Sequence, residues 1–281
     1  MKNAIVIINY NDFKTTLRLF ENIKNYKCFD MIVIVDNSSS DDSYLNLKQI
    51  KAKNLSVIQT SQNKGYSSAI NFGCDYLLKK YKRCNIAISN SDIIINREAD
   101  LKKLFSYVSD KNVVVGPTII QKNELSRGWK LPTIKDDIAL NLPNHRKYEK
   151  KHLLYPDSHY SDDTSKVDAV SGSFFIINSD FYQQMNKFDE NVFLYYEENI
   201  LGKKVKQLKK QTIVVNKINI IHDHSLTIDK NISKLKKYNM LKKSQYYYEK
   251  KYNKANIIML GILKLSVFIM RLFLKIKYIF E

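Results

Sequence analysis

The sequence predicts an α/β fold, with a mainly parallel central sheet flanked by helices and a C-terminal helical extension. Two observations lead to this prediction. Short apolar runs of strand length alternate with longer segments in which apolar residues recur every three or four positions, as they do on one face of an amphipathic helix. In addition, three of the apolar runs end directly in a cluster of polar side chains. The chain has 281 residues, of which 44% are hydrophobic, so it can bury a sizeable core.

The first part of the chain has the order βαβαβαβ. Leu17, Phe20 and Ile23 show the helical spacing in the first of its helices. Alternating strands and helices imply a parallel sheet with right-handed crossovers. The apolar runs are residues 4–8, 31–35 and 85–88, and the helical segments are 12–26, 42–51, 65–80 and 98–108.

The pattern loosens after Gly116-Pro117. The next segment carries Trp129 and three more prolines, and we interpret it as a long connection over the sheet edge, where loops often bind substrates. Regular strand patterns return at residues 173–177 and 212–221, and a segment at 188–201 separates these two predicted strands.

The cysteines form no recognisable framework, since they are odd in number and lack C-x-x-C spacing. Only Met1-Lys2-Asn3 precedes the first apolar run, so we expect no signal peptide, reduced thiols and a cytoplasmic location. The cysteines are Cys28, Cys74 and Cys84.

Polar clusters follow three of the predicted strands. They are Asn9-Tyr10-Asn11, the segment that begins with Asp36, and Asn90-Ser91-Asp92. Ligands of open α/β sheets bind beyond the carboxyl ends of the parallel strands, so these side chains should gather at one edge. Their oxygen atoms suit a nucleotide and a cation.

The first cluster is not a dinucleotide-binding turn, because no glycine-rich G-x-G-x-x-G segment follows the first strand. Asp36 can instead accept the imide N–H of uracil or thymine, with Tyr10 packed beside the ring. The alternative for Asp36 is to cap the helix that follows.

Two further segments offer phosphate and metal chemistry. Asn63 and Gly65 open a helix whose N–H groups favour an anion, and an ordinary turn is the alternative. Asp92 is suited to ligate a hard divalent ion, Mg²⁺ or Mn²⁺, that also holds a diphosphate. The alternative for Asp92 is a turn residue.

In order and approximate spacing, these motifs resemble the family 2 glycosyltransferases of the GT-A type. Residues 170–175, which include Gly172 and Ser173, look like the acceptor-side strand of that family. Residues 188–198 resemble its FDExFFLYxED signature. The similarity covers roughly residues 4–250 and is closest in style to bacterial rhamnosyltransferase-like enzymes of surface-polysaccharide assembly. It implies the GT-A nucleotide-diphospho-sugar transferase fold.

The resemblance also implies roles for individual residues. Asp36 would contact the base, Asp92 would hold the metal, and Glu198, paired with Glu197, would take the proton of the acceptor hydroxyl. Such a single displacement inverts the anomeric configuration. The implied nucleotide-sugar-binding residues are Asn9, Tyr10, Asn11, Asp36, Asn63, Gly65, Asn71, Asn90 and Ser91, and the acceptor-side residues are Gly172, Ser173 and Trp129.

The sequence departs from the family pattern at two places. The usual Glu-Asp pair is Glu197-Glu198, and Ile200 replaces a further acid. The alternative for the pair is the start of a solvated, lysine-rich helix. The metal motif keeps one carboxylate, and the resemblance implies that a histidine after the late strand joins it, His222 in preference to His224. The alternative for both histidines is an ordinary surface position.

The net charge of +18 is concentrated in the C-terminal extension, which we place at residues 230–281, after a sheet domain at 1–229. The extension holds twelve lysines and one arginine against two glutamates, a net +11. A nucleic-acid-binding protein would spread basic residues over the sheet domain, so we expect no nucleic-acid partner.

The end of the extension, residues 255–280, is apolar, with Lys264, Arg271 and Lys275 aligned in one stripe of a helix. Its longest uncharged run is too short for a confident span. We expect it to dock on an anionic membrane, at the inner face of the plasma membrane. The alternatives are packing against its own domain, packing against a second subunit in a homodimer, and a snorkelling transmembrane segment.

The sequence therefore predicts a metal-dependent inverting glycosyltransferase. Its donor would be a UDP- or dTDP-sugar, and its acceptor a hydroxyl of a lipid-linked or nascent cell-surface glycan, such as capsule, O-antigen or cell-wall polysaccharide. One alternative is a nucleotidyltransferase, which would want a basic, glycine-rich loop after the first strand. The other is a non-catalytic protein that binds RNA or acidic polysaccharide.

Overall fold

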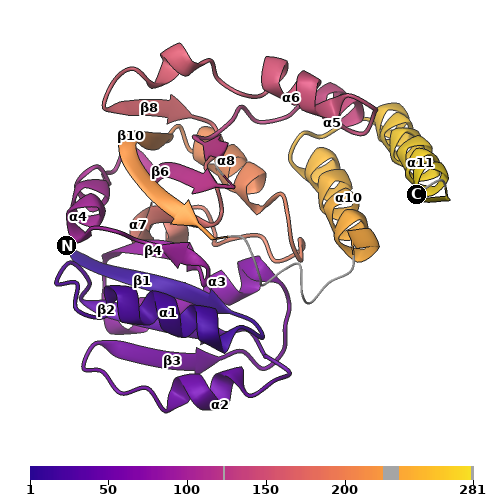
Figure 1. The fold of residues 1–281 in the computed structure, drawn as a ribbon. Helices are drawn as coiled ribbons and strands as arrows, with labels where there is room; N and C mark the ends of the chain where they lie inside the picture. Colours follow the sequence, from indigo (N-terminus) through magenta and orange to yellow (C-terminus); the bar gives the residue numbers. More distant parts are fainter. Residues whose placement is uncertain (123, 224–233, 280–281) are drawn as a thin grey trace.

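The computed structural model describes residues 1–122, 124–223 and 234–279 (Figure 1). It is built around one open sheet with the strand order β3-β2-β1-β4-β9-β6-β10-β5, and helices cover both faces. This arrangement confirms the predicted α/β class.

The first four strands in chain order are parallel, as the sequence predicts. Asn9 lies opposite Asp36 across the β1–β2 ladder, and Ile8 lies opposite Asn90 across the β1–β4 ladder. The polar clusters at the ends of these strands are therefore neighbours. The strands are β1 (Lys2–Asn9), β2 (Met31–Asp36), β3 (Leu55–Gln59) and β4 (Cys84–Asn90).

Apolar residues on the two faces of the sheet build two separate cores. Alternate residues of β1 and β2 point to opposite faces, so Val6 joins the core under α3 and Ile7 joins the core under α1. The helices of this half are α1 (Phe13–Ile23), α2 (Ser43–Lys48), α3 (Tyr66–Lys80) and α4 (Glu98–Ser106). All three cysteines are buried free thiols.

The other half of the sheet is mixed, because β9 runs antiparallel between β4 and β6. This reversal brings the chain just before β9 to the end of β4, where the Asn90 N–H donates to the Ser173 carbonyl at 2.9 Å. The remaining strands are β5 (Ile93–Ile94), β6 (Asn112–Gln121), β7 (Glu124–Ser126), β8 (Thr164–Val167), β9 (Phe174–Asn178) and β10 (Gln211–His222). Helices α7 (Ser179–Gln184) and α8 (Glu197–Gln207) follow β9.

The interpretation of the chain after Gly116-Pro117 as an irregular connection is wrong at its start. Both residues lie inside β6, where Pro117 lacks an N–H for the ladder. The parallel partner β10 accommodates the missing N–H with a bulge between Val215 and Asn219. The connection that follows contains β7, α5 (Ile134–Leu140), α6 (His145–His152) and the 3₁₀-helix η1 (Asp157–Tyr160).

The C-terminal helices pack beside α5 (Figure 1). The fully buried Tyr248 of α10 lies in one cluster with Val192, Tyr196 and Ile200. The two helices are α10 (Lys234–Lys251) and α11 (Ile257–Ile279). The predicted boundary at residues 229 and 230 falls outside the described residues. Within the described part of the chain, none of the helices combines the length and apolarity needed to cross a bilayer.

Candidate active site

Asp36 lies at the centre of the polar edge formed by β1, β2 and β3. It is completely buried, and its carboxylate accepts hydrogen bonds from Asn9 Nδ2 at 2.8 Å and Gln59 Nε2 at 3.1 Å. It also accepts from the Ser39 N–H at 3.0 Å and the Ser39 hydroxyl at 2.6 Å. A carboxylate offers about four lone-pair sites, so any further N–H donor would have to replace one of these four. Gln59, which is exposed, is the most easily displaced.

Asn9 and Asn11 cross-link the ends of β1 and β2. Asn9 is fully buried and accepts from Thr16 Oγ1 at 2.7 Å. Asn11 adopts a left-handed φ of 52°, its N–H donates to Ser39 Oγ at 2.9 Å, and its Oδ1 accepts the Ser40 N–H. Tyr10 lies half-exposed between the two asparagines. The structure thus brings these three predicted residues together with Asp36.

The turn at Asn63 and Gly65 contacts the loop that leads into α8. Asn63 Oδ1 accepts the Gly65 N–H at 3.0 Å and Asn37 Nδ2 at 3.0 Å. Gly65 has a φ of 103°, and a Cβ there would lie 2.3 Å from the Phe193 carbonyl oxygen. The Tyr66 N–H donates to the same carbonyl at 2.9 Å. Only glycine allows this close approach.

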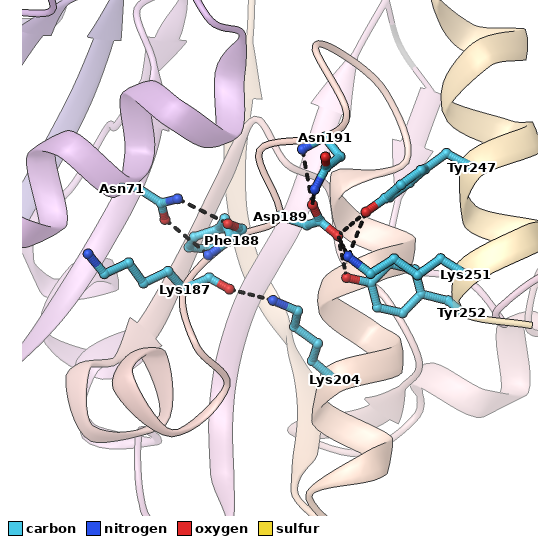
Figure 2. Close-up of polar contacts among 9 residues, drawn as sticks. All are labelled: Asn71, Lys187, Phe188, Asp189, Asn191, Lys204, Tyr247, Lys251 and Tyr252. Atoms are coloured by element: carbon cyan, nitrogen blue, oxygen red, sulfur yellow. Dashed lines mark hydrogen bonds and ion pairs between the residues drawn. The ribbon is translucent and has the colours of Figure 1, made fainter.

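Asn71 holds the start of that loop rather than joining the strand ends. Its Nδ2 donates to the Phe188 carbonyl at 3.0 Å, and its Oδ1 accepts the Phe188 N–H at 3.0 Å (Figure 2). Its Nδ2 also donates to Glu190 Oε1 at 2.8 Å. The amide of Asn71 is therefore engaged by the 188–198 loop.

Asp92 and His222 meet at the ends of neighbouring strands. β5, which begins directly after Asp92, pairs with β10, so that His222 lies opposite Ile93. His222 Nε2 lies 3.0 Å from Asp92 Oδ1, and both side chains are nearly buried. Asn90 and the buried Ser91 precede Asp92 in the same turn.

The donor set of this pair fits an octahedral cation. Adjacent ligands at about 2.1 Å from such an ion are about 3.0 Å apart, which is the spacing between Asp92 Oδ1 and His222 Nε2. Among the described residues, no group of three or more His, Cys, Asp or Glu side chains forms a complete cage. Mg²⁺ commonly takes one or two protein ligands and completes its shell with substrate phosphates and water. His224 lies outside the described residues.

Glu197 and Glu198 form the first turn of α8, after two strained residues. Tyr195 and Tyr196 both adopt left-handed φ angles, 71° and 70°, which turn the chain into the helix. Glu198 Oε1 accepts the Gly172 N–H at 3.2 Å. A Cβ on Gly172 would lie 2.6 Å from that oxygen, so the missing side chain makes room for the carboxylate.

The environment raises the pKa of both acids. Burial raises the pKa of Glu198, although the N–H groups of Glu198 and Gly172 offset part of this effect. Burial and the charge of Glu198 raise the pKa of Glu197 well above its usual value. Glu197 is 8% exposed, whereas Glu198 is partly accessible.

Tyr66 connects these acids with the Asp92–His222 pair. Burial raises the pKa of Tyr66 well above its ordinary value, and the charges of Glu197, Glu198 and Asp92 raise it further. The Tyr66 hydroxyl therefore lies within electrostatic reach of all three carboxylates. The Tyr66 hydroxyl donates to the Gly172 carbonyl at 2.9 Å. Sequence reasoning missed Tyr66, although its place after Gly65, at the first position of the helix, was a usable signal.

The acceptor-side candidates lie on two sides of Glu198. Ser173 follows Gly172, and its hydroxyl lies 2.8 Å from that of Ser171. Trp129 is half-buried, and its Nε1 donates to Asn199 Oδ1 at 2.8 Å, on the residue after Glu198. Gln59 is a second residue that sequence reasoning missed, although it ends the short apolar run of β3.

Comparison with known proteins supports the resemblance to the family 2 glycosyltransferases. The family model described as "Glycosyl transferase family 2" matches residues 4–185. The chain is 28% identical over 203 residues to the low-salt glycan biosynthesis hexosyltransferase Agl10 of Haloferax volcanii, across 69% of this chain and 58% of that protein. It is 25% identical over 203 residues to rhamnosyltransferase WbbL of Escherichia coli K12, across 69% of this chain and 73% of that protein.

A solved structure of GalNAc-T7 with UDP, GalNAc and Mn²⁺ shares the fold, with a TM-score of 0.61 at 15% identity. The likeness covers 90% of this chain and 49% of that one, and it confirms the GT-A type of fold. Because the family model matches more than half of the 281 residues, and the motifs that carried the resemblance lie in one fold, this chain belongs to glycosyl transferase family 2.

Proposed function

We propose that this protein transfers a sugar from a nucleoside-diphosphate sugar to an acceptor hydroxyl, with inversion at the anomeric carbon. The observation that carries the proposal is a pair of adjacent contacts: Glu198 accepts the Gly172 N–H at 3.2 Å, and the carbonyl of the next residue, Ser173, accepts the N–H of Asn90, two residues before Asp92, at 2.9 Å. The proposed base and the candidate metal ligand would therefore lie near each other, at the carboxyl ends of the strands. The hexosyltransferase and rhamnosyltransferase names of the two relatives are consistent with it.

The donor in this proposal is a UDP- or dTDP-sugar. Its base would lie at the β1–β2 edge, where Asp36 would accept the imide N–H in place of Gln59, and Tyr10 would flank the ring. Uracil and thymine present the same imide edge, so both remain candidates. Asn9, Asn11 and Ser39 would keep the Asp36 carboxylate oriented through the hydrogen bonds described above.

Glu198 is the proposed base, in preference to Glu197. It is the more accessible of the two, and the Gly172 N–H holds one of its oxygens in place. The acceptor hydroxyl would give its proton to Glu198 while its oxygen forms a bond to the anomeric carbon. The bond from that carbon to the diphosphate breaks at the same time. A raised pKa makes Glu198 a better acceptor for an alcohol proton.

Asp92 and His222 would hold Mg²⁺ or Mn²⁺ together with the diphosphate. The ion would act as a Lewis acid that neutralises charge on the leaving group. Their near-complete burial and their place at the ends of neighbouring strands support this assignment.

The proposed acceptor is a lipid-linked or nascent cell-surface glycan, reached by docking on the inner face of the plasma membrane. α11 exposes large apolar residues along one face, including Ile257, Ile258, Leu265 and Phe268. Burying such a side chain stabilises by about 1.5–3 kcal/mol, and each nearby cation on an anionic surface adds about 1 kcal/mol. Lys264, whose Nζ lies 4.8 Å from the Tyr246 ring centroid, is one of the cations of α11.

A donor screen tests the proposed function. Purified protein with Mn²⁺ or Mg²⁺ is mixed with UDP- and dTDP-sugars, and release of the nucleoside diphosphate is measured. We expect turnover with at least one donor, and a loss of about 10²- to 10⁴-fold in Glu198→Gln with donor binding retained. Glu21→Gln, on the exposed face of α1, is the matched control. Normal transfer by Glu198→Gln would refute the base assignment.

A further inference from the structure

A large cavity adjoins the candidate active site and shares Trp129 with it. Its volume is about 770 Å³, within the range of about 300–1,000 Å³ that is typical of ligand sites. One wall comes from β7, α5, α6 and the segments between them, and the other from α8, α10 and α11. Asp92, His222, Glu198 and Gly172 do not line it.

The lining combines aliphatic side chains and aromatic rings, which make up most of its surface, with amides and balanced charges. Its four charged groups are two acids and two bases, so it favours no strongly charged ligand. The aromatic residues are Trp129, Tyr155, Tyr160, Tyr196 and Tyr238, the amides are Asn141, Asn199 and Gln245, and the charged residues are Glu124, Glu149, Arg127 and Lys242.

This chemistry matches a neutral saccharide. A sugar ring has apolar C–H faces, which pack on aromatic rings, and a rim of hydroxyl groups, which both donate and accept. Tyrosine and tryptophan offer an apolar face together with a polar atom. The exposed carboxylates of Glu124 and Glu149 can accept hydrogen bonds from the same hydroxyl groups.

Trp129 connects the cavity to the candidate active site. Its Nε1 donates to Asn199, the residue after Glu198 in α8. Its backbone N–H donates to the Ala169 carbonyl at 3.1 Å, on the segment that leads to Gly172. The wall of the cavity is therefore tied to the elements on both sides of the Glu198–Gly172 contact.

We propose that this cavity is a carbohydrate-binding subsite, which anchors sugar units of the acceptor that lie away from the hydroxyl being glycosylated. The acceptor part of this inference rests on the proposed function, whereas saccharide binding in the cavity does not. An anchor of this kind selects acceptors that already carry several sugar units.

The protein contains a single tryptophan, so Trp129 fluorescence reports directly on the cavity. The 281-residue chain is titrated, without nucleotide, with three probes: maltotriose, chitotriose and a rhamnose trisaccharide. We expect at least one of them to change the emission in a saturable way. Inorganic diphosphate serves as the anionic probe and should leave the emission unchanged.

Variants on the two walls locate the binding. Tyr155→Ala and Tyr238→Ala should each raise the apparent Kd at least tenfold. The control is Tyr44→Ala, on α2, whose ring lies outside the cavity. Leu125→Phe, at an exposed position of the lining, narrows the cavity without disturbing the core and should weaken binding in the same direction.

The proposal is overturned if none of the three saccharides changes the emission, if diphosphate alone changes it, or if the wall variants bind as tightly as the parent protein. Failure of the proposed function has a different signature. Saccharide binding without turnover of any nucleotide-sugar would refute the transferase assignment and leave the subsite standing. Turnover of a nucleotide-sugar without saccharide binding would refute the subsite and leave the transferase assignment standing.

Discussion

The hydroxyl of Tyr252, just after α10, donates a 2.6 Å hydrogen bond to Oδ2 of Asp189, near the start of the 188–198 loop (Figure 2). Tyr247 at 2.8 Å and Lys251 at 2.9 Å donate to the same oxygen. Further along, Ser244 Oγ donates to the Leu194 carbonyl at 2.8 Å. Helix α10 and the residue after it therefore hold the loop that ends at Glu197 and Glu198. In this way α10 positions the proposed base.

Asp189→Asn should test this positioning role. Burial alone would raise the pKa of Asp189, but hydrogen bonds from Tyr252 and Asn191, and the ion pair with Lys251, bring the pKa below its usual range. Losing the charge should cost about 1–3 kcal/mol of unfolding free energy and lower kcat about tenfold, with a smaller change in the KM for donor. Urea unfolding and steady-state kinetics measure both quantities.

The same variant has a pH signature. A carboxyl with a lowered folded-state pKa stabilises the protein above its unfolded-state pKa, about 3.9, and this contribution is lost as the pH falls through the folded-state value. Asp189→Asn should therefore lose less stability on acidification than the parent protein. Asp163→Asn, at an exposed ion pair with Lys217, is the control for kcat. An unchanged kcat in Asp189→Asn would argue against positioning by α10.

Gly172→Ala should displace the proposed base. The added Cβ would lie 2.6 Å from Glu198 Oε1, so the carboxylate must move away from the Gly172 N–H. A misplacement of about 1 Å can lower the rate about 100-fold, and donor affinity should change little, because the strand-end pocket is untouched. Single-turnover kinetics and donor titration separate the two effects. Gly261→Ala in α11 meets no atom within 4 Å and is the matched control.

The pH dependence of transfer should report the raised pKa of Glu198. Since the base acts in its ionised form, kcat/KM should rise with pH through a limb that lies above about 4.3, the ordinary value for glutamate. The Glu198→Asp variant should still show a rise of kcat/KM with pH. The Glu198→Gln variant should lose this rise together with its activity. A pH–rate profile of the parent protein that is flat across this range would contradict the assignment.

Membrane docking should depend on the apolar face of α11. Leu265→Asp with Phe268→Asp places two charges on that face, and we expect binding to anionic liposomes to fall more than tenfold. Sedimentation with anionic and neutral vesicles measures the effect. The control is Leu45→Asp, on α2, which alters an equally exposed leucine far from the extension. Docking through α11 is excluded if the double variant sediments like the parent protein.

Part of the site was predictable because strand ends are local features of the sequence. A run of apolar residues ending in Asp36 or in Asn9 predicts where each polar group leaves the sheet, and parallel pairing then places the two opposite each other. The sequence analysis did not predict β6, because a proline such as Pro117 usually interrupts a strand. The bulge that accommodates Pro117 lies in the partner strand β10, so the sequence of β6 alone does not reveal it.

The sequence by itself determined the α/β class, the parallel order of the first strands and the polar residues at their ends, because these depend on periods of two and 3.6 residues along the chain. Tertiary structure decided the insertion of antiparallel β9, the contact of Gly172 with Glu198, and the contacts of α10 with Asp189. These contacts join residues tens of positions apart, and their geometry follows from packing and burial across the whole fold, which no local pattern encodes.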